Sequence, residues 1–485
     1  MLSNSISSTV IMRGTPGSLL TFLVWEDGAP GRVGLGQVAE ISLAIDPGSV
    51  GFWITRALSF GIPIEGPSRD FGETVLRLRD PDGIAIKLVG ADIEAKGRPA
   101  DAKGITASEA IKRIRGATLF SNDAAQTVSF LESFFGYRRG SAIVPIQRMV
   151  SESGDVVDVR DAAGFWPGAP GTGVVDHIAF RAPDIATLRK VEHRLRALNS
   201  TTTNSHDRKY FVSLYVRETG GTLFELATDG PGMLVDEQLE TLGTRLFVPP
   251  GDAARAEDLQ VMLPQFAMPG EERIRYLELP FVHRFSVPDE ADGTTLVLLH
   301  GSGGNETDLM PLASRIAPRA QRLGVRGRST EEQTLRWFRR FSTTSFDQAD
   351  IRSEAEAFAE FVREAVEGYA LEPDKLIFLG YSNGANFIVA VTLLHPGLIK
   401  KAVLLRPTMV LQDPPNVTLF GTHVVLVPGE TDFPLGHLET TETALRERNA
   451  YVDVVVVRAG HALDLADVDA GKQALSLLNT VSQPS

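Results

Sequence analysis

KLIFLGYSNGANF, residues 375–387, joins an apolar strand-like run to a glycine-rich turn and then to a helix-like segment. A turn of this kind between a buried strand and a helix can hold a serine hydroxyl group exposed above a sheet. Gly380 and Gly384 would then be required, because a side chain at either position would crowd the turn. The Gly-x-Ser-x-Gly pattern is short and also occurs by chance. The residues around it therefore decide whether Ser382 is a nucleophile or a surface serine.

The apolar runs on both sides of this stretch lack polar alternation. They are TLVLLH (295–300), KLIFLG (375–380), KAVLLR (401–406), HVVLVPG (423–429) and VDVVVV (452–457). Long helix-like segments separate them, for example residues 353–369. Runs of this kind are typical of a parallel sheet that is buried on both faces. The sequence therefore predicts an α/β domain with a mostly parallel sheet in the C-terminal half.

A serine hydroxyl group is a weak nucleophile unless a base removes its proton and a carboxylate orients that base. Asp432 follows the apolar run that begins at residue 423, and His461 follows the next run. The resulting chain order of serine, acid and histidine is the order expected for a serine on a strand-to-helix turn. We predict Ser382, Asp432 and His461 as a catalytic triad. The alternatives that stay open are Glu430, Asp464 and Asp467 for the acid, and His395, His423 and His437 for the base.

A glycine-rich loop follows the first run of the predicted parallel sheet. Its sequence, LLHGSGGNETDL (298–309), can present backbone N–H groups to an oxyanion. We predict the backbone N–H groups of Ser302 and Asn383 as the two donors, because Asn383 directly follows the predicted nucleophile. A phosphate-binding loop is the alternative, but the stretch lacks both the Lys-Ser/Thr ending and the Gly-x-Gly-x-x-Gly spacing of such loops.

Residues of about 275–485 resemble the serine carboxylesterase/phospholipase branch of the α/β-hydrolases. The motifs LLHGSGGNETDLMPLA, VRGR, WFRRF, LGYSNGAN, LLHP and GHAL occur in the order that this branch uses. The resemblance implies hydrolysis of short- to medium-chain carboxylic esters of small molecules through an acyl-enzyme, without a cofactor. It also implies that residues 325–341 border the acyl pocket.

The N-terminal half has a different sequence pattern, in which short runs of alternating polar and apolar residues dominate. A strand, a helix and then two or three further strands recur, in copies that begin near residues 38, 113 and 174. The repeat predicts an α+β fold of small modules rather than a parallel sheet. Its regularity ends where proline, glycine and charged residues cluster. We therefore predict an N-terminal domain over 1–265, a linker over 266–274 and a C-terminal domain over 275–485.

Residues 1 to about 265 contain PGSLLTF, FGETVLRLRDPDG, DHIAFR and HDRKYFVSLYVRETGGTLFELATDGPG. With these phrases the half resembles a glyoxalase-like, vicinal-oxygen-chelate ring-cleaving dioxygenase of the hydroquinone type. That family forms a barrel from four βαβββ modules and holds Fe(II) with two histidines and one glutamate. The resemblance implies His177 and Glu225 as metal ligands. It also implies that Arg208 and Tyr215 lie beside the metal, where they would steady a phenolate or superoxide.

The family's third ligand, a histidine of the first module, has no counterpart, because this chain has no histidine before His177. We expect the first module to be incomplete, as in an N-terminally truncated sequence, and Asp176 stands where the family commonly has another histidine. Two alternatives stay open. Either His177 and Glu225 are inherited residues without a metal, or they hold Fe(II) with a donor from elsewhere, for which His206 is an unsupported candidate.

The composition narrows the classes of function. The 485-residue chain has a net charge of −13 and no cysteine, so we expect neither a disulfide nor a nucleic-acid partner. Apolar residues near the N-terminus are interrupted before they reach the length of a signal peptide or a membrane span. We therefore expect a cytoplasmic protein without a membrane partner. Whether copies of the chain form a homo-oligomer stays open.

The sequence favours a serine carboxylesterase whose N-terminal half is a structural or interaction domain. The alternative is a bifunctional enzyme of aromatic catabolism, which would combine Fe(II)-dependent extradiol-type cleavage of a hydroquinone ring with ester or acyl hydrolysis. A third hypothesis treats both halves as a ligand-binding scaffold. It requires the occurrence of Ser382, Asp432 and His461 in this order to be a coincidence.

Overall fold

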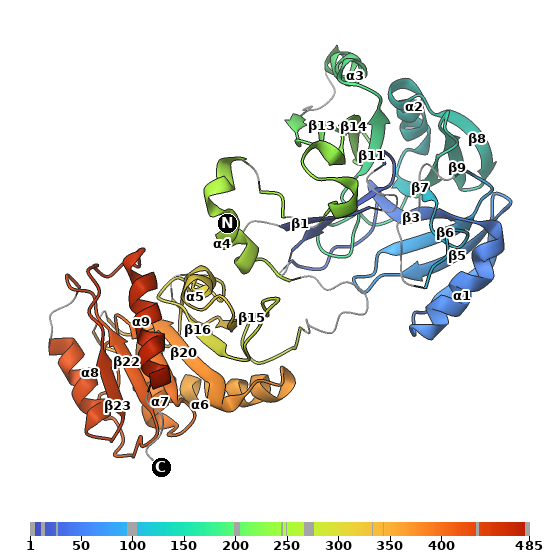
Figure 1. Ribbon diagram of the computed structural model, residues 1–485. Coiled ribbons are helices and arrows are strands. Elements are labelled where there is room, and N and C mark those ends of the chain that lie inside the picture. The colour runs from blue at the N-terminus through green and yellow to red at the C-terminus, as the bar shows by residue number, and fades with distance from the viewer. Residues whose placement is uncertain are drawn as a thin grey trace. The chain divides into compact units, whose positions relative to one another are not determined.

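The computed structural model describes residues 5–10, 15–25, 28–94, 104–197, 204–243, 246–248, 250–265, 276–331, 333–342, 344–432 and 436–480. The chain divides into two compact units, Met1–Leu246 and Phe247–Ser485 (Figure 1). The linker expected over 266–274 lies outside the described residues, and the domain boundaries taken from the sequence stay a prediction.

Three consecutive modules of one strand, one helix and three strands form most of the N-terminal unit. They contain β3 (Gln37–Ile45), α1 (Val50–Ser59), β4 (Ile64–Asp70), β5 (Glu73–Arg79) and β6 (Ala85–Gly90); β7 (Arg113–Ser121), α2 (Ala124–Phe135), β8 (Arg138–Ile143), β9 (Ile146–Val150) and β10 (Val156–Asp161); and β11 (Ile178–Ala182), α3 (Ile185–Ala197), β12 (Asn204–Asp207), β13 (Phe211–Arg217) and β14 (Leu223–Pro231). In each module the first strand pairs in parallel with the last one. The recurring βαβββ unit expected from the sequence is therefore confirmed.

The modules assemble into curled mixed sheets. Antiparallel pairing of β3 with β7 joins the first two modules into an eight-stranded sheet of order β4-β5-β6-β3-β7-β10-β9-β8. The third module forms a four-stranded sheet of order β11-β14-β13-β12. A separate antiparallel pair, β1 (Ser5–Val10) and β2 (Leu19–Val24), precedes the three modules.

Local sequence explains helix α2 and the core that it covers. The side chain of Asp123 accepts the backbone N–H of Gln126 at 3.0 Å, which caps the first turn. Gly136 ends the helix at a φ of +70°, a left-handed conformation that glycine adopts without strain. Leu131 of α2 is fully buried in one cluster with Leu188 of α3, so the two helices close a common core over the sheets.

The C-terminal unit contains a seven-stranded sheet of order β15-β17-β16-β20-β21-β22-β23. Its strands are β15 (His283–Ser286), β16 (Thr295–Leu299), β17 (Gln321–Val325), β20 (Leu376–Tyr381), β21 (Lys401–Leu405), β22 (His423–Val427) and β23 (Tyr451–Val454). Every neighbouring pair is parallel except β15 with β17. The mostly parallel sheet predicted from the continuous apolar runs is confirmed.

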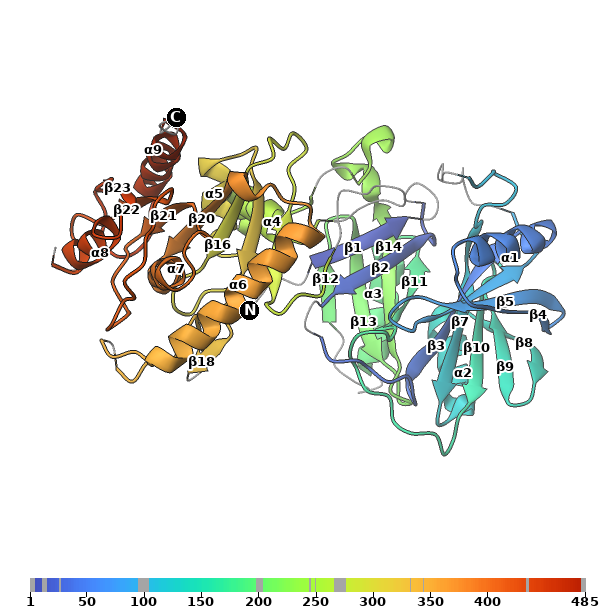
Figure 2. The same ribbon diagram turned by 90° about the horizontal axis from the view of Figure 1, so that it is seen from below.

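Helices cover both faces of this sheet. They are α4 (Ala256–Met262), α5 (Met310–Ile316), α6 (Gln348–Gly368), α7 (Asn383–Leu394), α8 (Gly436–Arg446) and α9 (Ala466–Thr480). Helices α6 and α7 contribute to the core on one face, and α5 and α9 contribute to the core on the other (Figure 2). No helix among the described residues has the length and apolar character needed to cross a membrane.

Several short elements lie between the larger helices and strands. A hairpin of β18 (Ser329–Glu331) and β19 (Thr334–Arg336) lies between β17 and α6. Short 3-10 helices cover Pro47–Ser49, Met233–Val235, Leu239–Thr241, Pro250–Arg255 and Pro373–Lys375. In the parallel sheet, the ends of β20, β21 and β22 lie at one edge, which is the edge where open α/β sheets place ligands.

Candidate active site

Ser382 lies on a sharp turn between β20 and α7. Its backbone has φ and ψ angles of +50° and −114°, which a residue with a side chain rarely adopts. A Cβ atom on Gly384 would come within 2.2 Å of the carbonyl oxygen of Leu299, and one on Gly380 would come within 2.6 Å of Ile388 Cδ1. The two glycines therefore allow the close packing that this strained turn needs.

The three residues predicted as a triad lie in contact. The Oγ atom of Ser382 lies 3.0 Å from Nε2 of His461. The Nδ1 atom of His461 lies 3.0 and 3.2 Å from the two carboxylate oxygens of Asp432. Because an ionised carboxylate only accepts hydrogen bonds, Nδ1 carries the proton and Nε2 can accept the hydroxyl hydrogen of Ser382. The arrangement can move a proton from the serine to the histidine.

Most of the alternative acids and bases contact groups other than Ser382 and His461. Asp467 forms a fully buried ion pair with Arg406, and the side chain of Asp464 accepts the backbone N–H of Ala466, the first residue of α9. Glu430 is exposed. The Nε2 atom of His423 lies 2.9 Å from Asp453 Oδ2. His395 directly follows α7, and its Nε2 atom lies 3.6 Å from Glu356 Oε2. The side chain of His437 lies outside the described residues.

The glycine-rich loop after β16 is fixed by the β18–β19 hairpin. The backbone N–H of Gly303 donates to the carbonyl oxygen of Leu335 at 2.8 Å, and Arg336 donates to Ser302 Oγ at 2.6 Å. The backbone N–H of Trp337 donates to Asn383 Oδ1 at 2.9 Å. One segment therefore holds both residues that are predicted to supply oxyanion donors. The Asn383 N–H, at the first position of α7, has no acceptor within its own helix.

His300 and Trp337 form the buried base of this loop. Gly327 N–H donates to His300 Nε2 at 2.9 Å, and His300 Nδ1 donates to the carbonyl oxygen of Gly301 at 2.7 Å. Burial lowers the pKa of His300, so the neutral ring is favoured. The indole N–H of Trp337 donates to the carbonyl oxygen of His300 at 2.9 Å. Trp337 and Phe338 are almost fully buried, and which residue of the 325–341 segment would face an acyl group stays a prediction.

Two further side chains reach the loop that carries His461, and the sequence reasoning missed both. Arg406 Nε donates to the carbonyl oxygen of Gly460 at 2.8 Å. The hydroxyl group of Tyr381 donates to the carbonyl oxygen of His461 at 3.0 Å. A charged residue at the end of a buried apolar run, as in KAVLLR, was the available signal, because a buried charge needs a partner.

In the N-terminal unit, the two predicted metal ligands bind each other. His177 lies one residue before β11, because pairing with β14 begins at Ile178. Its Nε2 atom lies 2.8 Å from Glu225 Oε2 on β14, and its Nδ1 atom lies 2.8 Å from Asp176 Oδ2. Burial alone would lower the pKa of His177, but hydrogen bonds to the two carboxylates outweigh it and raise the pKa to about 9. The two carboxylates therefore favour the protonated form of the ring.

This donor set does not fit an Fe(II) site. Glu225 also accepts a hydrogen bond from Ser213 Oγ, so both of its oxygens are engaged. In the part of the chain that the structure describes, no group of three histidine, aspartate or glutamate side chains is arranged to hold a metal ion. Arg208 lies beside Tyr215, whose ring also contacts the rings of His177 and His206. The predicted neighbours therefore gather at His177, but His206 does not complete a metal site.

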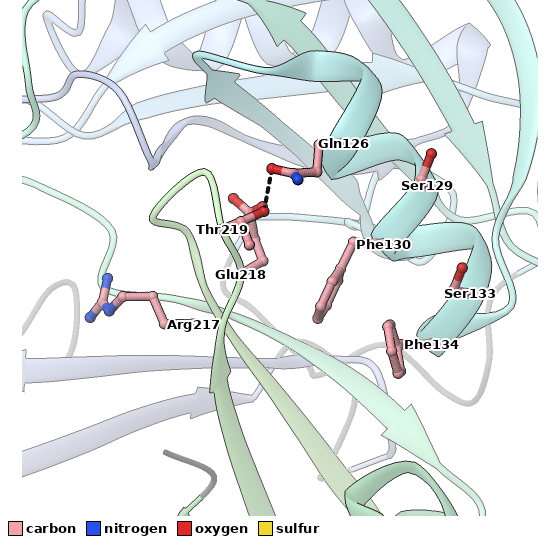
Figure 3. Close-up of a pocket in the computed structure, with 8 residues that line it drawn as sticks. All are labelled: Gln126, Ser129, Phe130, Ser133, Phe134, Arg217, Glu218 and Thr219. Atoms are coloured by element: carbon pink, nitrogen blue, oxygen red, sulfur yellow. Dashed lines mark hydrogen bonds between the residues drawn. The ribbon is translucent and has the colours of Figure 1, made fainter. Parts of the chain in front are cut away.

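A pocket of about 260 Å³ lies elsewhere in the N-terminal unit, between α2 and the turn that joins β13 to β14 (Figure 3). Phe130 and Phe134 line it, and Arg217 extends away from both rings. The hydroxyl group of Thr219 donates to the side chain of Gln126 at 2.5 Å. The pocket contains none of the predicted site residues, and Ser129 and Arg217 donate to the backbone carbonyl groups of Ala125 and Gly221.

No family model matches the chain, but relatives match each part of it. One relative is MhqO from Bacillus subtilis (strain 168), which is named as a ring-cleaving dioxygenase. It is 34% identical over 238 residues, which cover 49% of this chain and 75% of the relative. MhqD from the same organism, named as a hydrolase, is 33% identical over 181 residues, which cover 37% of this chain and 90% of the relative.

Solved structures match the same two parts. The crystal structure of a protein named as a dioxygenase from Bacillus subtilis subsp. subtilis str. 168 has a TM-score of 0.51 at 30% identity and covers 54% of this chain and 84% of its own. A carboxylesterase from Mesorhizobium loti has a TM-score of 0.41 at 39% identity and covers 42% of this chain and 99% of its own. The N-terminal region of the chain belongs to the family of the ring-cleaving dioxygenase MhqO, and the C-terminal region belongs to the family of the hydrolase MhqD.

Proposed function

We propose that the chain is a serine carboxylesterase that hydrolyses short- to medium-chain esters of small molecules. The observation that carries the proposal is the unbroken chain of contacts from Ser382 through His461 to Asp432, with the serine on a strained strand-to-helix turn. The likeness of the C-terminal region to MhqD and to a carboxylesterase supports the same reaction class.

The first half of the reaction forms an acyl-enzyme. Ser382 Oγ attacks the ester carbonyl carbon while His461 Nε2 takes the hydroxyl proton. Asp432 keeps the His461 Nδ1 proton in place and stabilises the imidazolium that forms. The carbonyl oxygen becomes an oxyanion, which accepts hydrogen bonds from the backbone N–H groups of Ser302 and Asn383. When the carbon–oxygen bond to the alcohol breaks, the imidazolium returns its proton to the departing alkoxide.

The second half releases the acid and restores the enzyme. A water molecule attacks the acyl carbon while His461 Nε2 takes one of its protons. The intermediate collapses, the bond to Ser382 Oγ breaks, and the serine recovers its proton from His461. No cofactor takes part in these steps. The rigid support of the glycine-rich loop by Arg336 and Trp337 matters here, since donors that are already oriented need no rearrangement as charge develops.

Hydrolysis of a short p-nitrophenyl ester by the full-length chain tests the proposal. We expect turnover by the natural protein and a loss of several orders of magnitude in kcat for Ser382→Ala. Ser353→Ala is the matched control, because Ser353 is exposed on α6 and lies outside the proposed site. Unchanged turnover in Ser382→Ala, or no turnover by the natural protein, would refute the esterase function.

Membership of the N-terminal region in a ring-cleaving dioxygenase family favours a second candidate, a bifunctional enzyme that also opens a hydroquinone-type ring. The donor set around His177 does not support the Fe(II) that this chemistry uses, so we derive no step for it. The test measures oxygen uptake with hydroquinone in the presence of Fe(II), together with the iron content of the purified protein. Uptake with bound iron would establish the second activity, whereas neither is expected.

A further inference from the structure

The loop that carries His461, residues 458–465, is held at two consecutive carbonyl groups. Arg406 Nε donates to the carbonyl oxygen of Gly460 at 2.8 Å, and Tyr381 Oη donates to the carbonyl oxygen of His461 at 3.0 Å. These oxygens belong to the two peptide units on either side of the His461 Cα atom. Because each peptide unit is planar, holding both units sets the backbone angles of His461.

The two donors come from the ends of neighbouring strands. Tyr381 is the last residue of β20 and directly precedes Ser382, and Arg406 directly follows β21. Arg406 has a φ of +55°, an uncommon value for a residue with a side chain. This backbone conformation turns the chain sharply at the end of the strand, and the surrounding contacts must offset its strain.

Asp467, in the first turn of α9, fixes the guanidinium group of Arg406. Two hydrogen bonds of 2.7 and 3.0 Å join the two groups, and both side chains are fully buried. Asp467 also accepts the backbone N–H of Asp464 at 2.9 Å. The pair therefore joins the end of β21, the start of α9 and the loop that carries His461.

The loop that carries Asp432 closely approaches the Gly460 carbonyl group and the Arg406 guanidinium group. A Cβ atom on Gly429 would come within 2.6 Å of the Gly460 carbonyl oxygen and within 3.0 Å of Arg406 Nε. The backbone N–H of Thr431 donates to the carbonyl oxygen of Ala459 at 3.3 Å. The acid loop and the histidine loop are thus packed on each other beside the Arg406 guanidinium.

A buried ion pair is not by itself a source of stability. Taking both charges out of water costs roughly as much as their attraction returns, and apolar side chains of similar volume often serve stability equally well. The pair between Arg406 and Asp467 nevertheless does one thing that apolar side chains could not do, because it donates a hydrogen bond to the Gly460 carbonyl group.

We infer that Arg406, oriented by Asp467, and Tyr381 are positioning residues that hold the His461 ring between Ser382 and Asp432. This inference rests on the proposed esterase function. None of the three side chains needs to touch the substrate in this role. They act through the backbone of His461, whose Nε2 atom must stay within hydrogen-bond reach of Ser382 Oγ to take its proton.

Kinetics of two variants with p-nitrophenyl ester test the inference on the full-length chain. Tyr381→Phe removes one hydroxyl group and keeps the ring. The double variant Arg406→Met/Asp467→Leu removes the other contact while leaving no unpaired charge, so it avoids the destabilisation that a single change would cause. Leu478→Ala is the control, because its apolar side chain is buried in the core beside α9 and cannot form either of the two hydrogen bonds that hold the loop.

Misplacement of a reacting group by about 1 Å can cost about 100-fold in rate. We therefore expect kcat to fall about 10-fold in Tyr381→Phe and about 100-fold in the double variant, with KM changed less than about 2-fold. Leu478→Ala should melt at a lower temperature but keep the kcat of the natural protein. A kcat within about 2-fold of the natural value in both loop variants would overturn the inference, given that the natural protein turns over the ester and Ser382→Ala does not.

A second measurement separates this inference from the esterase proposal. The imidazole proton that His461 Nδ1 shares with Asp432 gives a low-field signal in proton NMR when the ring is held, whether or not an ester is hydrolysed. We expect this signal in the natural protein and in Leu478→Ala, and its loss in both loop variants. Its retention in those variants would refute the positioning role even if the natural protein showed no turnover.

Discussion

His461 and His177 each have a hydrogen-bonding side chain at both ring nitrogens, and these side chains differ in kind. His461 has a serine hydroxyl group at one ring nitrogen and the Asp432 carboxylate at the other. His177 has a carboxylate at each ring nitrogen, from Glu225 and Asp176. A hydroxyl group can give a proton to a neutral ring, whereas two carboxylates can only keep the ring protonated. One arrangement can transfer a proton, and the other is a closed ion pair.

This difference in partners shows that histidine has different roles in the two units. In the C-terminal unit, His461 is placed by a loop whose backbone is held on both sides, and its side chain is 43% exposed toward solvent. In the N-terminal unit, the Glu225 side chain is only 6% exposed and uses its oxygens on His177 and Ser213. Exposure leaves His461 open to a substrate, while burial and pairing close the His177 site.

The largest expected effect is a loss of esterase activity when His461, but not His177, is replaced. His461→Ala should lower kcat for p-nitrophenyl ester hydrolysis by about 10⁴-fold or more, because the serine loses its base. His177→Ala should leave kcat unchanged, because this side chain belongs to the other unit. Steady-state kinetics of both variants would measure the contrast. A similar loss in both variants would contradict the separation of roles.

A smaller effect concerns the stability of the N-terminal unit. Glu225→Gln keeps the shape of the side chain but removes the charge that pairs with the His177 imidazolium. A hydrogen bond to a charged group contributes about 1.5 to 3 kcal/mol, so we expect a loss of about 2 kcal/mol in the free energy of unfolding. Urea denaturation followed by a probe specific to this unit would measure it. Glu152→Gln, at an exposed turn position, is the control and should change little.

The pH dependence of stability should have opposite signs at His177 and His300. The folded pKa of His177 is raised to about 9, so its contribution is present below its unfolded pKa and is lost as pH rises through about 9. The stability difference between the natural protein and His177→Gln should therefore shrink between pH 7 and pH 10. A difference that stays constant over this range would contradict the ion pair.

Burial lowers the folded pKa of His300 in the C-terminal unit, which reverses the sign. The contribution of the neutral ring is present above its unfolded pKa and is lost as pH falls through the folded pKa. The C-terminal unit should therefore unfold more easily in acid. Thermal unfolding of the natural protein and His300→Gln at several acidic pH values would measure the effect, and a variant with the same acid sensitivity as the natural protein would argue against it.

The smallest expected effect is the response to metal. A ligand that binds only the folded state raises the melting temperature by an amount that grows with the logarithm of its concentration relative to its Kd. We expect no rise for the N-terminal unit with Fe(II), Mn(II) or Zn(II), because His177 and Glu225 bind each other. Calorimetry with and without each metal tests this. A concentration-dependent rise that disappears in His177→Gln would show a metal site after all.

Much of the fold could be predicted from the sequence, because the two halves have different periodicities. Continuous apolar runs indicated the parallel sheet, and the recurring strand and helix pattern indicated the modules. The apolar run over 452–457 did not predict where its strand ends, since β23 ends at Val454 although the run continues to residue 457. The neighbouring strand β22 ends at Val427, so only an isolated bridge between Gly429 and Val457 continues the pairing.

The residues of the candidate site could be found by chain order, because parallel strands bring their carboxyl ends to one edge of the sheet. The supports of that site could not be found in this way. The contact of Arg406 with Asp467 joins residues 61 positions apart, and it depends on how α9 packs on the sheet. The contacts of the β18–β19 hairpin with the glycine-rich loop likewise depend on tertiary packing rather than on local pattern.

Trapping and locating the acyl-enzyme would test the esterase function of Ser382 most directly. The full-length chain would be mixed with a slowly deacylating p-nitrophenyl ester, quenched in acid and analysed by mass spectrometry of the intact protein and its peptides. We expect the mass of one acyl group on the peptide that contains Ser382, and no added mass in Ser382→Ala. An unmodified natural protein that nevertheless releases p-nitrophenol, or an acyl group on another residue, would contradict it.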